Sequence, residues 1–445
     1  MKFTTNYKKV GNYEAKESEV KKCLLLYSGG LDTSIILKWI QDAYQCEVTT
    51  LTIDLGQQAD DLESIKKKAL YLGAKKAIVL DAKKEFAENY ITQTIKANGD
   101  YQGGYHLSTP IGRPLISKLA IETALKEGID AVAHGCTGKG NDQVRFDSYM
   151  LCLNPDIKII APVREWSMGR QEQIEYAAQN NIPIPNTSKS PYSYDDNLWG
   201  LSAEGGVIED PGKIIPLEEV LKITNIPEKA PDNSEEIKIG FEKGVPVSLN
   251  GENLDLVELI QHINKVGAKH AIGITTHLED RLVGLKIRDV YEQPGSEILI
   301  KAHQSLEKIV STQSENKFKT IIDQEWAYLC YNAKWFEPTM SHLNAYIESV
   351  NQKVTGEVTI KLYKGNAGII AIKSPFSLFD SSLATFEKNN AFNQNASAGF
   401  IEIYNLAQKT ACQINNPLHI NHNNHENINK EINSEKVPTK QQVSL

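Results

Sequence analysis

The stretch of sequence that decides the fold is Tyr27-Ser28-Gly29-Gly30-Leu31-Asp32-Thr33-Ser34. An apolar run at 22–27 leads into the two glycines, and a helical pattern begins a few residues later, at 33–43. Glycines let successive backbone N–H groups turn inward, and the start of a helix adds free N–H groups and the positive end of the helix dipole. This order of strand, glycine turn and helix predicts an anion-binding loop.

Hydroxyl groups and one carboxylate accompany the glycines of this loop. Ser28, Thr33 and Ser34 can donate to a phosphate. Asp32 suits a phosphate only if a cation lies between them, and Mg²⁺ is the obvious candidate. A glycine turn whose Asp or Thr caps the helix, with no ligand, is the alternative. The loop lacks the lysine of the G-x-x-x-x-G-K-[ST] motif, and the full string instead resembles the pyrophosphate loop of enzymes that split ATP between its α- and β-phosphates.

Short apolar runs alternate with helical patterns around this loop, which is typical of a parallel sheet with crossover helices. The strands are expected to be apolar on both faces, and we place them at 22–27, 48–54, 77–81, 129–134 and 157–161. We place the helices at 33–43, 62–72, 114–127 and 171–180. Gly73 and Gly128 follow two of these helices and suit left-handed caps. The pattern predicts an α/β fold with a Rossmann-like nucleotide-binding domain.

The pattern changes after the proline-rich segment 181–188, which we interpret as a linker. We predict an N-terminal extension at 1–20, the nucleotide-binding domain at 21–185 and an α+β domain at 186–398. The second domain is expected to contain strands at 236–242, 245–249, 356–363 and 367–373, and helices at 255–266 and 341–349. A last amphipathic helix is expected at 399–410, within an end segment 399–412, followed by a disordered asparagine-rich tail at 413–445. The tail's His419, His422 and His425 are not expected to bind a metal.

Length and composition narrow the class of protein. A chain of 445 residues favours two domains, and 41% hydrophobic with 23% charged residues is ordinary for a soluble protein. The formal net charge of -8 argues against a nucleic-acid partner. There is no apolar run of membrane-spanning length and no signal or transit peptide, so we expect a cytoplasmic protein. The six scattered cysteines are interpreted as reduced and mostly buried thiols.

A second glycine-rich loop follows the expected strand 129–134, and it reads Gly135-Cys-Thr-Gly-Lys-Gly-Asn-Asp-Gln-Val-Arg-Phe-Asp147. Open α/β sheets bind ligands at the carboxyl ends of their strands, where this loop lies. Its glycines allow close backbone approach, Lys139 supplies a point charge, and Arg145 offers a bidentate fork for a carboxylate. A surface turn with Asn141 or Asp142 as a helix cap is the alternative.

The two loops together resemble the argininosuccinate synthase family, whose signature G-x-T-G-K-G-N-D-Q-V-R-F matches the second loop. The resemblance covers roughly 22–412 and includes the segments Asn253-Leu-Asp, Glu279-Asp-Arg-Leu-Val-Gly, Val290-Tyr-Glu and Ser374-Pro-Phe-Ser-Leu. It implies an adenine nucleotide α-hydrolase-like first domain, a synthetase second domain, and a homotetramer whose C-terminal helices embrace neighbouring subunits. It also implies ATP and Mg²⁺ as requirements and citrulline and aspartate as small-molecule substrates.

The resemblance assigns site residues by position. The implied ATP contacts are Leu26, Tyr27, Ser28, Gly29, Gly30, Leu31, Asp32, Thr33, Ser34, Ile53, Gly135, Thr137, Gly138, Lys139 and Gly140. The implied aspartate contacts are Thr109, Thr137, Asn141 and Asp142. The implied citrulline contacts are Tyr105, Asn141, Arg145, Ser193, Ser202, Glu279 and Tyr291. The residues expected to carry the chemistry are Asp32, Asn141, Asp142 and Arg145.

The family reaction adenylates the ureido oxygen of citrulline and then lets the aspartate amine displace AMP. Such a reaction can run on positioning and charge stabilisation, which explains why no nucleophilic triad is apparent. In this scheme Arg145 suits a substrate carboxylate, Glu279 a substrate ammonium, and Asn141 a bridge between the two amino acids. Asp32 is expected to help place Mg²⁺ on the leaving pyrophosphate.

Departures from the family pattern cluster at the amino-acid end of the expected site. Pro110 and Gly112 follow Thr109 where Ser or Ala is frequent, and the segment 275–287 differs at several positions, among them Asp280 and Ile287. The departures lie away from the residues expected to bind ATP. The alternatives are a related pyrophosphate-loop enzyme with another substrate, such as a different ureido or amine compound, and a catalytically silent nucleotide-binding regulator.

Overall fold

The computed structural model describes residues 8–57, 61–166, 168, 170–183, 191–384 and 391–415. It divides into two compact units, Met1–Leu378 and Phe379–Leu445. The predicted boundary at 185/186, most of the predicted linker and residues 416–445 of the predicted tail, with its three histidines, lie outside the described residues. The first three residues predicted for the disordered tail, 413–415, are instead the end of the helix Leu406–Asn415. No helix in the described part of the chain combines the length and the apolar composition that a bilayer crossing needs.

A five-stranded parallel sheet organises the first part of the larger unit. Its strands are β1 (Lys22–Leu26), β2 (Glu47–Asp54), β3 (Lys76–Asp81), β4 (Ala131–Ala133) and β5 (Lys158–Ile160), in the order β3-β2-β1-β4-β5. β1 is central, and its Leu24 and Leu25 are fully buried on opposite faces. The strand order reverses between β1 and β4, and ligands bind open α/β sheets at such a reversal. The predicted α/β class and Rossmann-like sheet are confirmed.

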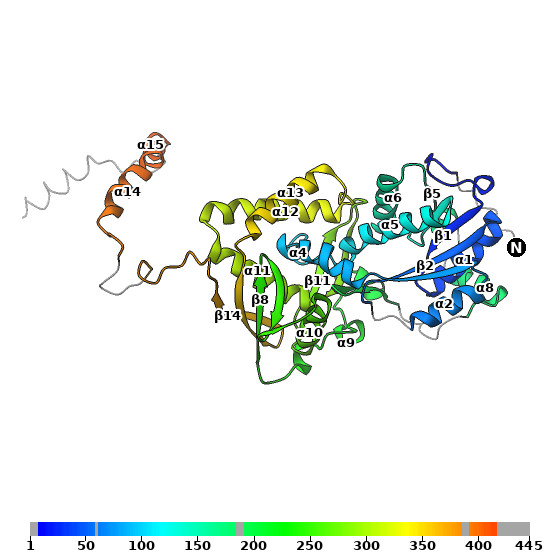
Figure 1. Cartoon of the computed structure of the whole chain (residues 1–445), viewed down its shortest axis with the longest axis horizontal. Coiled ribbons are helices and arrows are strands. Elements are labelled where there is room, and N and C mark those ends of the chain that lie inside the picture. Colours follow the sequence, from blue (N-terminus) through cyan, green and yellow to red (C-terminus); the bar gives the residue numbers. More distant parts are fainter. Residues whose placement is uncertain are drawn as a thin grey trace, which may run out of the picture. The chain divides into compact units, whose positions relative to one another are not determined.

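Helices cover both faces of this sheet, as Figure 1 shows. One face packs against α1 (Leu31–Tyr44), α2 (Leu62–Tyr71), α7 (Pro162–Glu165) and α8 (Arg170–Gln179). The other face packs against α5 (Ser108–Glu127) and α6 (Asp142–Leu153). Gly73 and Gly128 follow α2 and α5 with φ of 92° and 60°, so both expected left-handed residues are present.

Two antiparallel sheets follow in the same unit. A four-stranded sheet has the order β11-β12-β7-β6, with β6 (Ser193–Asn197), β7 (Gly200–Glu204), β11 (Ile274–Asp280) and β12 (Lys286–Glu292). A five-stranded sheet has the order β10-β9-β8-β13-β14, with β8 (Glu235–Glu242), β9 (Val245–Leu249), β10 (Glu252–Asn253), β13 (Gly356–Tyr363) and β14 (Asn366–Lys373). The longer helices here are α10 (Leu256–Lys269), α11 (Pro294–Val310), α12 (Gln313–Tyr331) and α13 (Pro338–Asn351), and a short one is α9 (Leu217–Val220).

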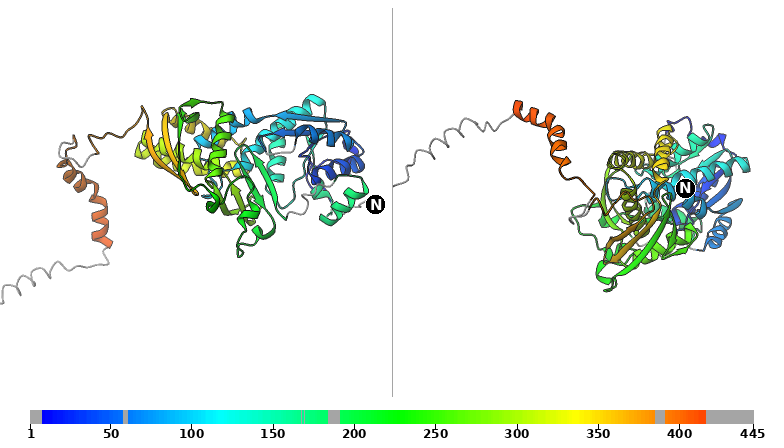
Figure 2. Two further views of the ribbon diagram at one scale, coloured as in Figure 1. Left: turned by 90° about the horizontal axis from the view of Figure 1, so that it is seen from below. Right: turned by 60° about the vertical axis from the view of Figure 1, so that its left-hand side comes forward.

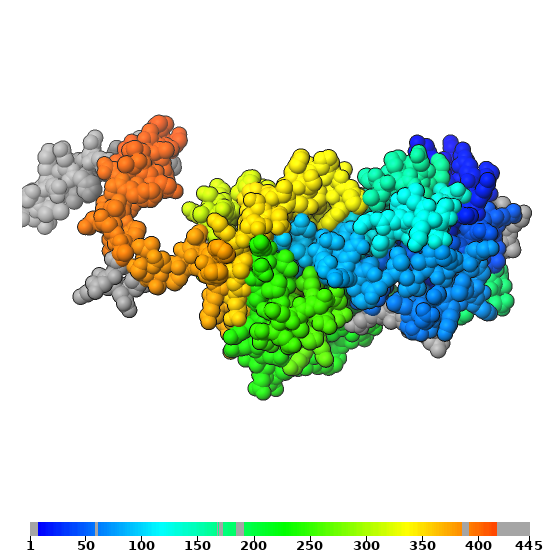
Figure 3. Space-filling view, in the orientation of Figure 1, coloured from blue at the N-terminus to red at the C-terminus, as the bar shows by residue number. Residues whose placement is uncertain are grey.

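The parallel-sheet region and the antiparallel region share one core. The connecting elements α3 (Lys83–Phe86), η2 (Ala87–Ile91) and α4 (Thr92–Lys96) carry the chain across. Buried side chains of this connection and of α5 join one continuous cluster with those of α10, α11 and α12, among them Phe86, Leu115, Ile260, Ile298 and Trp326. Figures 2 and 3 show the connection lying between the two regions. The shared core fixes the antiparallel sheets against the amino-terminal half of α5 and so against the parallel sheet.

Several local predictions were wrong. The helix expected at 114–127 begins at Ser108, because Leu107 takes a left-handed conformation and starts the helix six residues earlier. Pro110 lies in the first turn, where the N–H has no intrahelical partner, and Pro114 lies opposite the carbonyl of Pro110. The single helix expected at 399–410 is two helices, α14 (Ala396–Tyr404) and α15 (Leu406–Asn415).

The expected burial of the cysteines is only partly confirmed. Cys23 and Cys330 are buried, whereas Cys152 and Cys412 are exposed. An apolar neighbourhood in sequence does not bury a residue. Cys152 is not among the buried residues of α6, and Cys412 lies in α15, which has no buried residues.

Candidate active site

The two glycine loops leave the parallel sheet side by side. Leu25 of β1 pairs with Ala133 of β4, so the first loop after β1 and the second loop after β4 begin at the same edge. A Cβ on Gly135 would lie 3.0 Å from the Ile36 side chain of α1, which shows how closely the second loop approaches the helix after the first. The predicted nucleotide loops are therefore neighbours in space.

The first loop opens onto the start of α1. Gly30 is the N-cap residue, and no side chain caps this helix, so the alternative of an Asp or Thr cap is not what the structure has. Gly29 has φ of 79°, and a Cβ there would lie 2.8 Å from Ile65, so only glycine fits. The Lys68 ammonium donates to the Gly29 carbonyl at 2.8 Å. A rigid turn thus presents the first N–H groups of α1.

Hydroxyl groups of the first loop bond to one another and to the backbone. The Ser28 and Thr33 hydroxyls lie 3.1 Å apart, and the Ser34 hydroxyl donates to the Gly30 carbonyl at 2.7 Å. The Tyr27 and Ser34 hydroxyls lie 3.0 Å apart inside the protein. Ser28 and Asp32 are exposed, so both side chains are accessible at the mouth of the loop. Leu26 and Leu31 are largely buried and contribute only their backbone to this surface.

The exposed part of the second loop lies at Thr137, Gly138 and Lys139. The Gly138 carbonyl accepts a bond from the Gln143 amide at 2.5 Å, and the Lys139 carbonyl lies 3.5 Å from the Arg281 guanidinium. Gly135 and Gly140 at the two ends of the loop are half-buried. The loop therefore presents a hydroxyl, an amine and backbone groups to solvent at the switch point of the sheet.

Asn141 joins this loop to the antiparallel region. Its Nδ2 donates to the Tyr331 hydroxyl at 2.8 Å, and its Oδ1 accepts from the Leu282 N–H at 2.8 Å. Asn141 occupies the N-cap position of α6, as the alternative interpretation expected, but its side chain makes no capping bond and contacts Tyr331 and Leu282 instead. Asn141 is 8% exposed, and its amide contacts two elements that are distant in sequence.

A partly buried ion network follows Asn141, in which the arginine side chains are largely buried and those of Asp142 and Asp195 are 26% and 38% exposed. Asp142 accepts from Arg113 at 2.7 Å through Oδ2 and from Arg145 at 2.9 Å through Oδ1, and Arg113 also contacts Asp195. Burial opposes ionisation of Asp142, but the charges of Arg113 and Arg145 outweigh it and hold its pKa well below the usual range. Two arginines and two carboxylates thus cross-link α5, α6 and β6.

The contacts of the Arg145 guanidinium differ from the predicted contact with a substrate carboxylate. Its Nε and Nη2 donate to the Tyr331 carbonyl at 3.1 and 3.0 Å, and the side chain is 3% exposed. The carbonyl at the end of α12 occupies the two donors that were expected to face a carboxylate. The cause is tertiary, because α12 ends against α6 and no sequence pattern predicts that contact.

One face of the four-stranded sheet carries the remaining predicted groups. Glu279 of β11 accepts from the Tyr291 hydroxyl at 2.7 Å and from the Tyr331 hydroxyl. Tyr105 stacks on Tyr291 with ring centroids 3.9 Å apart, and the Thr109 N–H donates to the Tyr105 hydroxyl at 3.0 Å. The structure therefore gathers five predicted residues around Glu279: Asn141, Tyr105, Thr109, Tyr291 and, through Tyr331, Arg145.

Three predicted residues lie at the margin of this arrangement. Ser202 pairs with Tyr291 across the sheet, and its hydroxyl donates to the Asp195 carbonyl at 3.3 Å. Ser193 is exposed on the edge strand β6, opposite Glu204. Ile53 is half-buried on β2, packed against the core beside the first loop.

Sequence reasoning missed four polar residues that hold this site: Arg113, Asp195, Asp289 and Tyr331. Asp289 lies two residues before Tyr291 on β12 and receives a bond from its hydroxyl at 3.3 Å. The spacing of two, which puts both side chains on one face of a strand, is a signal that could have identified Asp289. Arg113, Asp195 and Tyr331 carry no comparable local signal, because they enter the site only through tertiary contacts.

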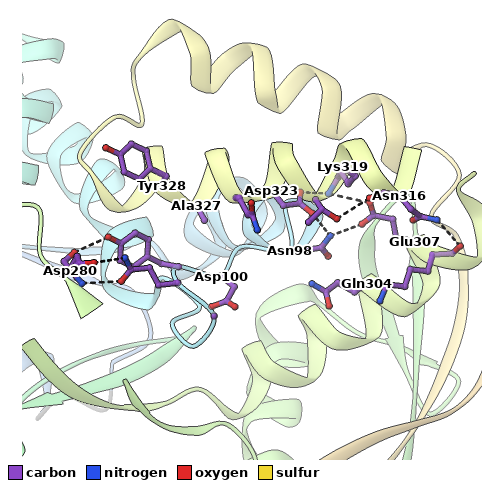
Figure 4. A pocket seen from close by; sticks show the side chains of 16 residues that line it. Asn98, Asp100, Asp280, Gln304, Glu307, Asn316, Lys319, Asp323, Ala327 and Tyr328 are labelled. Carbon is purple, nitrogen blue, oxygen red and sulfur yellow. Dashed lines mark hydrogen bonds and ion pairs between the residues drawn. The ribbon is translucent and has the colours of Figure 1, made fainter. Parts of the chain in front are cut away.

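A polar cavity of about 730 Å³, which Tyr101 helps to line, is drawn in Figure 4. Tyr101 stacks on Tyr331 at 3.7 Å and donates to the Asp280 carbonyl at 2.9 Å. Figure 4 shows Asp280 at one end of the cavity and Asn98, Glu307, Lys319 and Asp323 at the other. None of the predicted site residues lines this cavity. We take the two loops and the adjoining residues around Glu279 as the candidate active site, because most of the predicted polar groups lie there and none lines the cavity.

Asp289 gives a prediction about pH. Burial, with the charges of Glu279 and Glu204, raises its pKa from 3.8 to about 8. Between these values the folded protein keeps a proton that the unfolded chain has lost, so the free energy of unfolding falls as the pH rises. Asp289→Asn removes this dependence, and the stability of the variant relative to the wild type is expected to grow by up to about 1.4 kcal/mol per pH unit. Urea unfolding of both proteins at several pH values in this window measures the effect, and a difference independent of pH would contradict it.

Comparison with known proteins gives matches over nearly the whole described chain. Residues 22–183 match the model of the arginosuccinate synthase N-terminal HUP domain, and residues 192–411 match the model of the arginosuccinate synthase C-terminal domain. Both glycine loops and α6 fall within the first match, and the sheet that carries Glu279 and Tyr291 falls within the second.

Curated relatives are similar over their own full lengths. An argininosuccinate synthase from Symbiobacterium thermophilum is 47% identical over 394 residues, which is 88% of this chain and 98% of that protein. One from Pyrococcus furiosus is 48% identical over 89% of this chain and 96% of that protein. One from Brevibacillus brevis is 48% identical over 90% of this chain and 96% of that protein.

Proposed function

The chain belongs to the argininosuccinate synthase family, and we infer that it is a C–N ligase that joins citrulline to aspartate with cleavage of ATP to AMP and pyrophosphate. The observation that carries this function is the match of both family models together with 47–48% identity to curated enzymes of that name over most of their length. Its place in metabolism is the biosynthesis of arginine.

The position of the two loops side by side supports a proposal in which each binds a different part of ATP. The N–H groups at the start of α1 and the hydroxyls of Ser28 and Thr33 bind the phosphates that leave as pyrophosphate. The exposed groups of the second loop, among them Thr137 and Lys139, bind the rest of ATP. The ureido oxygen of citrulline attacks the α-phosphate and the bond to the β-phosphate oxygen breaks. The aspartate amine then attacks the ureido carbon, and the C–O bond breaks to release AMP.

The polar face around Glu279 supports the assignment of citrulline to that position. Its carboxylate, fixed by two tyrosine hydroxyls, is suited to the α-ammonium of citrulline, and the stacked Tyr105 and Tyr291 form an aromatic wall. Asn141 lies between this face and the second loop, where its amide can contact both amino acids. Aspartate is assigned to Thr109, Thr137 and Asp142 beside the loop. For Arg145 to bind a carboxylate, its fork must first leave the Tyr331 carbonyl.

A direct assay tests this function. Purified protein with ATP and Mg²⁺ is given citrulline and aspartate singly and together, and AMP and pyrophosphate are followed. Sustained formation of both products is expected only with both amino acids. Formation of AMP that is indifferent to both amino acids would sink the assignment, and turnover with a different ureido or amine compound would keep the mechanism and change the substrate.

We also propose that Asp32 helps to hold Mg²⁺ at the leaving pyrophosphate. The described residues contain no group of three or more His, Cys, Asp or Glu side chains that could hold a metal ion. A single carboxylate beside a phosphate loop fits Mg²⁺, which is commonly bound through one or two carboxylates and substrate phosphates. The ion would neutralise charge on the leaving group. Asp32→Asn is expected to raise the Mg²⁺ concentration for half-maximal turnover about tenfold, and unchanged turnover at low Mg²⁺ would remove this role.

The exposed C-terminal helices support a proposal of a homotetramer in which they pack on neighbouring subunits. α14 and α15 have no buried residues, and their large apolar side chains are exposed, among them Phe400, Ile401, Ile403, Tyr404 and Leu406. Exposed apolar helix faces of this kind mark interaction surfaces. Sedimentation is expected to give a tetramer for the full chain and smaller species for a chain ending at residue 395. A stable monomeric full chain would contradict the proposal.

The domain division and the location of the protein are likewise proposed. Domains at 21–185 and 186–398 are supported by the limits of the two family matches, which end at 183 and begin at 192.

All six cysteines are free thiols, which supports a reducing compartment and hence the cytoplasm.

A further inference from the structure

His134 lies at the junction between the end of β4 and the second loop. It is 1% exposed, and its two ring nitrogens contact different partners. Nε2 lies 2.7 Å from Asp147 Oδ1, and Nδ1 lies 3.2 Å from the backbone nitrogen of Cys136 inside the loop. The ring therefore links the first turns of α6 to the loop that follows β4.

These partners decide which nitrogen carries the proton. The Arg164 guanidinium donates to Asp147 Oδ2 at 2.8 Å, so this carboxylate is ionised and only accepts. Nε2 must then donate to Asp147, and Nδ1 is left as the acceptor of the Cys136 N–H. A proton on Nδ1 would place two donors against each other and release the loop.

A second contact holds the far side of the loop. Arg164 donates to the other Asp147 oxygen at 2.8 Å and to Gln143 Oε1 at 3.2 Å. Gln143 in turn donates to the Gly138 carbonyl at 2.5 Å. The loop is thus fixed at Cys136 and at Gly138, and the exposed Thr137 lies between these two points.

We infer that His134 is a positioning residue that fixes the loop from Gly135 to Gly140 for nucleotide binding through its bare Nδ1. The inference rests on the proposed function, in which this loop binds ATP. Three glycines make the loop easy to distort, and a loop that must be ordered by the ligand binds it more weakly. The competing interpretation is that His134 only fills the core, where its ring packs on Phe146 with centroids 5.9 Å apart.

Two substitutions separate these interpretations, because the amide of Asn reaches the position of Nδ1 and the amide of Gln reaches the position of Nε2. His134→Asn keeps an acceptor for the Cys136 N–H and gives up the contact with Asp147. His134→Gln keeps a donor to Asp147 and gives up the acceptor for the loop. Binding of Mg·ATP is measured by calorimetry without amino acids, and the KM values for citrulline and aspartate are measured at saturating ATP.

The Gln variant is expected to bind Mg·ATP about tenfold more weakly than the wild type, and the Asn variant within about threefold, since one hydrogen bond to the loop differs between them. The KM values for both amino acids are expected to stay within about twofold, because the contacts around Glu279 are untouched. Equal weakening by both variants, or no weakening by Gln, would overturn the inference and leave His134 as a core residue.

Two further results complete the test. If the Gln variant does not fold, amide hydrogen exchange in the wild type decides: slow exchange at Cys136 relative to Thr137 supports the inference, and equal rates overturn it. ATP binding without citrulline-dependent AMP formation would overturn the proposed substrate but leave the comparison of variants intact. A wild-type protein that binds no ATP would overturn both proposals.

Discussion

Glu279→Gln is expected to lower kcat/KM for citrulline by about 100-fold, because a buried charged partner of a substrate ammonium contributes about 3 kcal/mol. The substitution keeps the size of the side chain. Because Tyr291 donates to Oε2 and Tyr331 donates to Oε1, one hydroxyl can continue to donate to the amide oxygen and the other must accept from the amide NH2. The loss should appear in kcat/KM for citrulline and not in the KM for ATP, since the glycine loops lie across Asn141 from this face. Steady-state kinetics with each substrate varied in turn measures the effect.

Glu204→Gln is the matched control for this experiment. Glu204 is also a carboxylate of the four-stranded sheet, but its side chain is 53% exposed and pairs with Arg281 at 2.6 Å. An exposed ion pair contributes about 1 kcal/mol or less, so this variant should change kcat/KM less than about fivefold. Equal effects of the two substitutions would show that general negative charge on the sheet, rather than the fixed carboxylate of Glu279, binds citrulline.

Asp142→Asn is expected to lower the free energy of unfolding by about 3–5 kcal/mol, the cost of leaving buried charge without its partner. The variant removes the carboxylate shared by Arg113 and Arg145, and Arg113 retains only Asp195. The pKa of Asp142 is below its ordinary 3.8, so its ionised form stabilises the fold above that pH and the contribution is lost as the pH falls below it. Urea unfolding at neutral pH measures the loss.

Glu88→Gln serves as the control for stability. Glu88 lies 3.8 Å from Lys84 in an exposed pair, and its loss should change the free energy of unfolding by less than about 1 kcal/mol. A value for Asp142→Asn as small as the control would mean that the two arginines find solvent or other partners when the carboxylate is removed, which would contradict the partly buried network described above.

The parallel sheet was predictable because its strands are short apolar runs covered on both faces, and because Gly73 and Gly128 mark the ends of two helices. The four-stranded sheet was not predicted. Its strand β6 reads Ser-Tyr-Asp-Asp-Asn, and β11 has polar residues on the face toward the site, so neither shows the apolar signal of a strand. The chemistry of the site requires those polar residues, and they conceal the strand pattern.

The prediction of where α5 begins was wrong for a different reason. Two prolines near its beginning argue against a helix in sequence terms. Pro110 lies in the first turn, where no intrahelical bond is lost, whereas Pro114 lies inside the helix and leaves the Pro110 carbonyl without its intrahelical donor. For the candidate site, the two glycine loops and the residues around Glu279 could be predicted from the sequence and from the resemblance to the family. The use of the Arg145 fork by the Tyr331 carbonyl did not, because it depends on where α12 ends in space.

In the proposed reaction the ureido oxygen of citrulline becomes bonded to the α-phosphate before the aspartate amine displaces it. This order is tested with citrulline labelled with ¹⁸O in the ureido group, which is incubated with the protein, Mg·ATP and aspartate, and the products are analysed by mass spectrometry. We expect one ¹⁸O atom in the phosphate of AMP and none in pyrophosphate. Recovery of AMP without label, or of label in pyrophosphate, would contradict it.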